Sequence, residues 1–205
     1  VVYPRLKGLD EKFPFINVIE RKPDDKNLSF GSSWLHQDTS YLANDRPRYT
    51  MLMGIEIPNG QGNTIFSSGF NAYEKLPNEI KDKIKDATGI FSSAGPISVT
   101  RLEREKEMGI KSSESMEAEH PIVKTVSGKK TLYVSPGHLM KIKNVKEEDA
   151  DYLKNYLIEH VNKQEFIFSY EWSKGDICLW DNLSILHMAS EIKNCKRIMH
   201  RITIK

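Results

Sequence analysis

Extended, half-buried segments dominate the hydrophobic and polar pattern in the first third of the chain. Residues 13–20 are aromatic and β-branched and precede a polar turn cluster, so we expect a strand there. Residues 49–57 form a nearly continuous apolar run. The turn sequence 58–62 follows, and an extended pattern resumes at 63–67. This order predicts a β-hairpin with a loose loop.

Two helices are expected in the middle of the chain. The first begins at Pro77, which suits the first position of a helix, and apolar residues then recur at helical spacing. The second follows Asn144 and Glu147, which resemble a capping box. It presents one apolar stripe that should pack against a sheet: Leu153, Tyr156, Leu157, His160 and Val161.

The C-terminal third returns to the strand pattern, at residues 166–172, 177–180 and 197–204. Many strands, few helices and turns rich in glycine and proline predict a mainly β fold, a sandwich or barrel with one or two packed helices. The segment 101–119 carries four positive and six negative side chains and few apolar ones. It is expected to be either a solvated, poorly ordered loop or a lid over a site.

Composition narrows the class of protein. A chain of 205 residues suits one domain with a proper core, and its net charge of +2 gives no reason to expect nucleic acid or an anionic membrane as a partner. No apolar run approaches the roughly 20 residues that span a bilayer. Two cysteines are too few to staple a domain of this size, so we expect a reducing, cytoplasmic location. The first residue is Val1, and we expect that a segment preceding it has been removed.

Candidate metal ligands lie far apart in the sequence. His36 and Asp38 are two residues apart, and in an extended strand this spacing places both side chains on one face. Such a pair occurs often by chance, so a third ligand is needed, and His187 is the candidate. Two histidines and one carboxylate form the facial triad suited to non-haem Fe(II), with the opposite positions open. Four protein ligands would instead indicate a structural zinc site.

Two arginines share one face of the last predicted strand. Arg197 and Arg201 alternate with apolar residues, and burying two arginines is costly unless anions meet them. They lie roughly 13 Å apart at ~3.3 Å per residue, too far to serve one small carboxylate. Structural bridges to acidic side chains are the alternative. For His120, His138 and His160 a structural role is the safer expectation.

Several motifs, in order from Trp34 to the C-terminus, resemble the taurine dioxygenase/TfdA family of Fe(II)- and 2-oxoglutarate-dependent dioxygenases. The motifs are WLHQD, GNTIFSS with AYEKLP, HPIVKTVSGKKTLYV, EFIFSYEWSKGDICLWDN before His187, and RIMHR. The resemblance implies a double-stranded β-helix (jelly-roll) core. It also implies iron held by His36, Asp38 and His187, with O2 and 2-oxoglutarate as co-substrates.

The same resemblance implies further site residues. Thr64 and Arg197 would hold the distal carboxylate of 2-oxoglutarate, and Trp180 would lie near the site wall. Arg201 matches the position that meets the substrate sulfonate in taurine dioxygenase. The chain departs from the family pattern at Leu35, an extra residue before His36, and at Leu183, where many relatives carry arginine.

The leading hypothesis is therefore a dioxygenase that hydroxylates a small organic acid and releases succinate and CO2. We expect residues 1–205 to form a single catalytic domain that lacks the N-terminal portion usual in the family. The sequence leaves the oligomeric state open, a homo-oligomer included. Two rivals remain: a non-catalytic jelly-roll module that binds an anion through its arginines, and a zinc-dependent hydrolase with an open three-ligand site.

Overall fold

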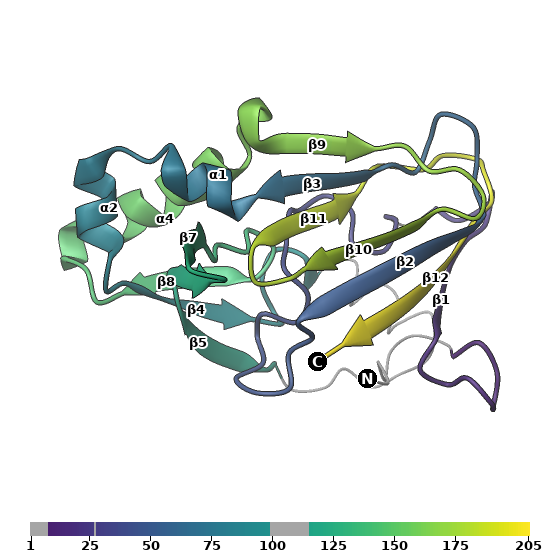
Figure 1. The fold of residues 1–205 in the computed structure, drawn as a ribbon, viewed down its shortest axis with the longest axis horizontal. Helices are drawn as coiled ribbons and strands as arrows, with labels where there is room; N and C mark the ends of the chain where they lie inside the picture. Colours follow the sequence, from purple (N-terminus) through teal and green to yellow (C-terminus); the bar gives the residue numbers. More distant parts are fainter. Residues whose placement is uncertain (1–7, 27, 99–114) are drawn as a thin grey trace.

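Two antiparallel sheets form the framework around the predicted site (Figure 1). The computed structural model describes residues 8–26, 28–98 and 115–205. The larger sheet has the strand order β1-β12-β2-β10, with bounds Asn17–Arg21, Arg197–Ile204, Tyr49–Glu56 and Ile177–Asp181. The smaller sheet has the order β11-β3-β9, with bounds Ile185–Ala189, Thr64–Ser68 and Ile167–Tyr170.

The two sheets pack against each other through an apolar cluster contributed by both. Leu52 and Met199 come from the larger sheet, Phe66 from the smaller one, and Trp172 and Trp180 complete the cluster. Residues of both sheets also line a single pocket. This arrangement, with strands predominating and helices confined to one side, is the expected jelly roll, so the predicted fold class is confirmed.

The second half of the fold lies beside this framework and contains the helices (Figure 1). A three-stranded sheet has the order β5-β4-β8, with bounds Glu117–Pro121, Thr88–Ser92 and Leu139–Lys143. A two-stranded sheet pairs β6 (Val123–Val126) with β7 (Lys129–Leu132). The helices are α1 (Gly69–Glu74), α2 (Asn78–Ile84), α4 (Glu147–Val161) and the short 3-10 helix η1 (Gln164–Phe166).

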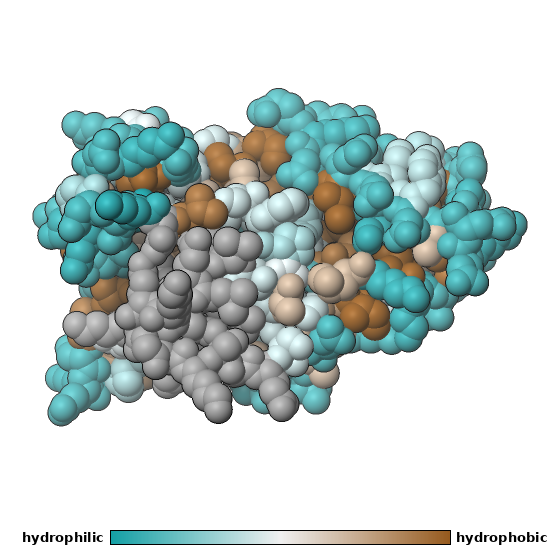
Figure 2. All heavy atoms as spheres, turned by 180° about the vertical axis from the view of Figure 1, so that it is seen from behind, coloured by the Kyte–Doolittle hydropathy of each residue, from teal (hydrophilic) through white to brown (hydrophobic). Residues whose placement is uncertain are grey.

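The exterior matches the composition of the chain. Seen from behind, the molecule is hydrophilic at both ends, with hydrophobic residues in separate patches between them (Figure 2). Within the described ranges, no helix combines the length and the apolar character that crossing a membrane requires.

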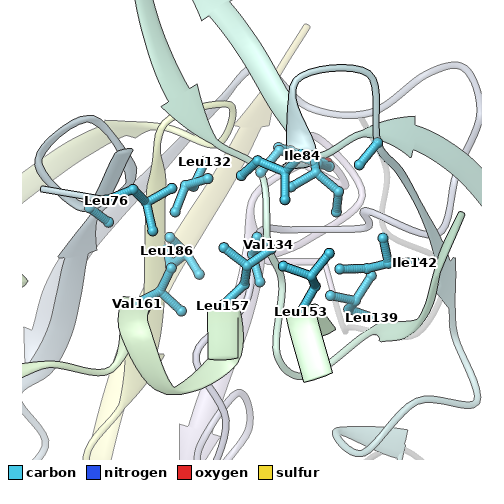
Figure 3. Packing of buried hydrophobic residues seen from close by; sticks show 14 of the residues in the cluster. Leu76, Ile84, Leu132, Val134, Leu139, Ile142, Leu153, Leu157, Val161 and Leu186 are labelled. Carbon is cyan, nitrogen blue, oxygen red and sulfur yellow. The ribbon is translucent and has the colours of Figure 1, made fainter. Parts of the chain in front are cut away.

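The main hydrophobic core lies between α4 and the strands around it (Figure 3). Leu153 and Leu157 of α4 are fully buried and point into the layer that holds Val134 and Ile142 (Figure 3). The spacing of these leucines produces the apolar stripe that the sequence predicts. Burying a leucine side chain contributes about 1.5–3 kcal/mol, so this core anchors the half of the fold that carries no predicted site residue.

Several predicted elements need correction. The N-terminal strand covers only Asn17–Arg21, four residues later than expected. The capping box is wrong: the N-cap of α4 is Lys146, without a side-chain cap. Asn144 instead has a positive φ of 58°, and its side chain donates to Thr88. Of the charged segment 101–119, residues 101–114 lie outside the described residues. Residues 117–119 belong to strand β5 and are not a loop.

Candidate metal centre and adjoining anion site

A short bridge between distant segments brings the two predicted histidine ligands together. His36 and His187 pair antiparallel, with mutual backbone hydrogen bonds of 3.0 and 2.9 Å. His187 is fixed in β11, whereas His36 lies in an irregular segment between β1 and β2. Their ring centroids are 4.5 Å apart. The backbone bridge therefore holds both imidazoles on one side of the pocket.

Asp38 completes the group. One ligand atom from each of His36, Asp38 and His187 lies within 4.8 Å of the others, and all three residues are buried. Asp38 Oδ1 is 3.7 Å from His187 Nε2. The spacing of His36 and Asp38 predicted that both lie on one extended strand. The structure has an isolated bridge at His36 and a turn at Asp38, yet the two side chains still converge.

The other carboxylate oxygen of Asp38 is held by two donors. Thr50 Oγ1 donates to Asp38 Oδ2 at 2.6 Å, and Arg201 pairs with the same oxygen at 2.7 Å. Asn182 donates to Thr50 Oγ1 at 2.8 Å, which fixes the threonine hydroxyl. Trp180 in turn donates to Asn182 Oδ1 at 3.1 Å. These contacts orient Asp38 so that Oδ1 faces the histidines, as partners of metal-binding carboxylates typically do.

Burial and nearby charges favour the forms of His36 and Asp38 that bind a cation. Burial, and next the nearby His187, lower the pKa of His36 to about 3, so its imidazole is neutral. Burial alone would raise the pKa of Asp38. The charge of Arg201 and the contacts with His187 outweigh burial and hold that pKa well below its usual range. The group therefore offers a carboxylate and a neutral imidazole.

The geometry of the three residues fits an ion. His36 Nδ1 bonds the Trp34 carbonyl oxygen at 2.9 Å, which leaves Nε2 for a ligand. His187 Nδ1 is buried without a hydrogen-bond partner among the described residues. Two histidines and one carboxylate on one side leave the opposite coordination positions open, as Fe(II) oxygenases require. Among the described residues, these three are the only histidine, cysteine or acidic side chains that lie close enough together to hold a metal ion.

All seven predicted site residues line one pocket between the two sheets. They are His36, Asp38, Thr64, Trp180, His187, Arg197 and Arg201. The remaining lining is mainly apolar and includes Ile19, Phe30 and Leu52. An apolar pocket with a few convergent polar groups is the usual form of a small-molecule site.

Arg197 is a buried cation without an acidic partner in the part of the chain that the structure describes. Its side chain is 5% exposed, and its Nε and one terminal nitrogen lack hydrogen-bond partners. Burial lowers the pKa of Arg197 to about 10. Gly62 permits this placement, because a Cβ there would lie 2.8 Å from the Arg197 side chain. An unpaired buried guanidinium is costly and indicates an anion at this position.

Thr64 and Trp180 flank the arginine and the metal group. Thr64 is buried, and its hydroxyl oxygen accepts a hydrogen bond from Trp172 at 3.0 Å, which leaves the hydroxyl proton available for a ligand. The Trp180 ring packs 4.6 Å from that of His187. Arg201, in contrast, forms an ion pair with Asp38. The structure therefore contains, for Arg201, the bridge to an acidic side chain that was the alternative to a role in binding an anion.

Sequence reasoning missed the residues that support the ligands. Thr50 and Asn182 carry no pattern of their own in one sequence, although Asn182 directly follows the WD pair. His138, expected to be structural, packs edge-on to His36 with centroids 5.9 Å apart. Ser40 and Ser135 bond its Nδ1 at 2.9 and 3.1 Å. These contacts tie the segment around His36 to the loop before β8, as a structural role requires.

The fold and the site together define a jelly-roll protein with a buried His-Asp-His group beside a buried arginine. The family model described as "Taurine catabolism dioxygenase TauD, TfdA family" matches residues 4–203. The chain therefore belongs to this family, and the family resemblance noted in the sequence is confirmed.

Individual relatives agree with this assignment. The chain is 31% identical over 192 residues to an alkylsulfatase of Acinetobacter baylyi, covering 88% of this chain and 59% of the relative. It is 28% identical to an alpha-ketoglutarate-dependent sulfate ester dioxygenase of Pseudomonas putida, covering 84% of this chain and 59% of that protein. The crystal structure of a taurine dioxygenase from Burkholderia xenovorans superposes with a TM-score of 0.73 at 25% identity, covering 95% of this chain and 65% of that one. The chain thus spans about three fifths of the length of these two curated relatives.

Proposed function

We propose that the chain is an Fe(II)- and 2-oxoglutarate-dependent dioxygenase that hydroxylates a small organic acid, with release of succinate and CO2. The observation that carries this proposal is one pocket containing a buried His-Asp-His group and a buried arginine without an acidic partner among the described residues. Membership of the family and the activities for which the relatives are named support the same reaction class.

In this proposal His36, Asp38 and His187 hold the iron. When bound, the iron supplies the redox chemistry with oxygen and 2-oxoglutarate. The contribution of the chain is to fix the ligand atoms. The His36–His187 backbone bridge sets the two imidazoles, and Thr50 and Arg201 hold one oxygen of Asp38. The remaining oxygen, Oδ1, then serves as the single carboxylate ligand.

Arg197 and Thr64 bind the distal carboxylate of 2-oxoglutarate in this proposal. Both side chains are buried in the pocket. Two Arg197 nitrogens have no hydrogen-bond partner among the described residues, and the Thr64 hydroxyl accepts from Trp172, which leaves its proton for a ligand. A guanidinium can form two parallel, charge-assisted hydrogen bonds with a carboxylate, a geometry that lysine cannot copy. The carboxylate would also neutralise a charge that is otherwise desolvated without compensation.

The prime substrate is proposed to be a small acid. Relatives are named for sulfate esters, sulfonates and 2,4-dichlorophenoxyacetate, all of which carry an anionic group on an organic body. Arg201 lies in the same pocket and remains the proposed contact for that anion, with one nitrogen shared with Asp38. The apolar walls, Ile19, Phe30 and Leu52, suit the organic body.

The experiment that tests the reaction class is a turnover assay with Fe(II), 2-oxoglutarate and a panel of sulfonates, sulfate esters and carboxylates, with succinate as the readout. We expect succinate formation that depends on iron, 2-oxoglutarate and oxygen. An anion-binding module would form no succinate with any member of the panel. A zinc hydrolase would turn substrate over without oxygen. Either result would overturn the proposal.

A further inference from the structure

Asn17 at the start of β1 is a buried amide without an explanation in the fold. Its side chain is 0% exposed, and neither the amide nitrogen nor the amide oxygen has a hydrogen-bond partner in the described structure. Burying a polar group without partners costs on the order of 1–3 kcal/mol. A buried position on a strand is ordinarily occupied by an apolar side chain. A buried amide there indicates a role other than packing.

The register of the larger sheet places this amide beside Arg201. Asn17 pairs directly with Arg201, and Ile19 pairs with Met199. Directly opposed residues of an antiparallel pair point to the same face, with Cβ atoms about 4.5–5.5 Å apart. Arg201 and Met199 are buried on the inner face, whereas Glu20 on β1 is exposed. The Asn17 side chain therefore points inward.

The neighbours of Asn17 on this inner face line the pocket, and Asn17 itself lies next to that lining without being part of it. Ile19, two residues from Asn17 on the same face, lines the pocket together with Arg201. The Arg201 guanidinium reaches Asp38 at 2.7 Å, so it lies immediately beside the proposed metal ligands. A ligand group that contacts both Asn17 and Arg201 would thus sit next to the metal group. It would also be separate from Arg197, which is four residues away along β12.

We propose that Asn17 is a specificity-determining residue, and that its side-chain amide donates to the same substrate oxyanion as Arg201. This inference rests on the proposed function and adds a residue to it. Arg201 uses one terminal nitrogen to hold Asp38, so it cannot give both to the substrate. A second donor from the neighbouring strand supplies the missing hydrogen bond. The ligand class is a sulfonate, sulfate ester or carboxylate on a small apolar body.

The test compares two variants with a matched control. Asn17→Leu keeps the forked shape of the side chain but removes the amide, and Asn17→Asp replaces the donor with a negative charge. Val18→Thr is the control, because Val18 lies on the same strand but faces the other side. Hexanesulfonate and hexanoate are titrated calorimetrically without oxygen, both onto the protein alone and onto the protein with Fe(II) and 2-oxoglutarate.

We expect Asn17→Leu to bind at least one of the two anions about tenfold more weakly than the parent, the effect of one hydrogen bond to a charged group. Asn17→Asp should bind neither, and Val18→Thr should match the parent. The affinity for 2-oxoglutarate should be unchanged in all variants. The urea midpoint of Asn17→Leu should be equal to the parent's or higher, because an unpartnered amide has been removed. Which anion loses more identifies the sulfonate or the carboxylate as the preferred group.

Three outcomes would overturn the inference. One is equal anion affinity in the parent, Asn17→Leu and Asn17→Asp. Another is parallel loss of 2-oxoglutarate affinity, anion affinity and stability in Asn17→Leu, which would indicate a structural role. The third is no binding of either anion by the parent. Failure of the proposed function is distinguishable, because it appears as absent 2-oxoglutarate binding in the parent, whatever happens at Asn17.

Discussion

Replacing Arg197 with methionine should stabilise the ligand-free fold and abolish tight binding of 2-oxoglutarate. Burial lowers the pKa of Arg197 to about 10, which means that the charged guanidinium is disfavoured in the ligand-free fold. At about 1.36 kcal/mol per pKa unit, the buried charge costs about 3 kcal/mol in the absence of an anion. Methionine resembles the arginine stem that packs on Gly62 and removes this cost. The free energy of unfolding should therefore rise by roughly 1–3 kcal/mol.

The same change removes the hydrogen bonds that Arg197 is proposed to donate to the distal carboxylate of 2-oxoglutarate. Two charge-assisted hydrogen bonds contribute about 1.5–3 kcal/mol each, so 2-oxoglutarate should bind roughly 100-fold more weakly or worse. The assay is urea unfolding with and without 2-oxoglutarate under anaerobic conditions. Lys196→Met is the matched control, because Lys196 is the exposed neighbour and pairs with Glu56 at the surface. Lys196→Met should change neither the free energy of unfolding nor the affinity for 2-oxoglutarate appreciably. The reasoning is refuted if Arg197→Met is destabilised while 2-oxoglutarate still protects it as it protects the parent.

Three other changes test separate parts of the structure. Thr50→Val removes a donor to Asp38 without changing the shape of the side chain. Fe(II) affinity, measured by equilibrium dialysis, should fall about 10–100-fold while the urea midpoint changes little. Unchanged Fe(II) affinity would contradict the role of Thr50 in orienting Asp38. Leu157→Ala, in the core away from the pocket, should cost about 2–5 kcal/mol of unfolding free energy with 2-oxoglutarate affinity preserved. Burial and the nearby Arg46 lower the pKa of Lys124 to about 7. Between about pH 7 and 10 the unfolded chain therefore binds more protons than the native one, and the free energy of unfolding rises with pH. Lys124→Met should flatten this rise, as measured by urea unfolding at a series of pH values. An identical dependence of stability on pH in the parent and the variant would refute the attribution to Lys124.

Periodicity predicted the parts of the fold in which burial follows a simple pattern. The apolar run before the 58–62 turn corresponds to β2, and the stripe ending at Val161 corresponds to α4. The capping box failed because Asn144 adopts a left-handed conformation at the end of β8, which side-chain type alone does not reveal. Strand β11 was not predicted, because its pairing with β3 is a long-range contact that local alternation does not record.

The site was predictable only where residue type carries the chemistry. Two histidines, a carboxylate and two arginines stand out in the sequence, and the structure brings all five into one pocket. Thr50 and Asn17 could not be found in this way. Their significance comes from position: Thr50 lies opposite Thr203 on β12 and reaches Asp38, and Asn17 lies opposite Arg201. A hydroxyl or an amide at an ordinary strand position gives no signal until the register is known.

The central claim, that His36, Asp38 and His187 bind iron beside a 2-oxoglutarate site, is tested most directly by visible absorption of the anaerobic Fe(II) protein. Adding 2-oxoglutarate should produce a metal-to-ligand charge-transfer band that saturates with one co-substrate per chain. The band should be lost in His187→Ala, since no described side chain can replace the missing ligand. Absence of the band in the parent, or an equally strong band in His187→Ala, would contradict the account.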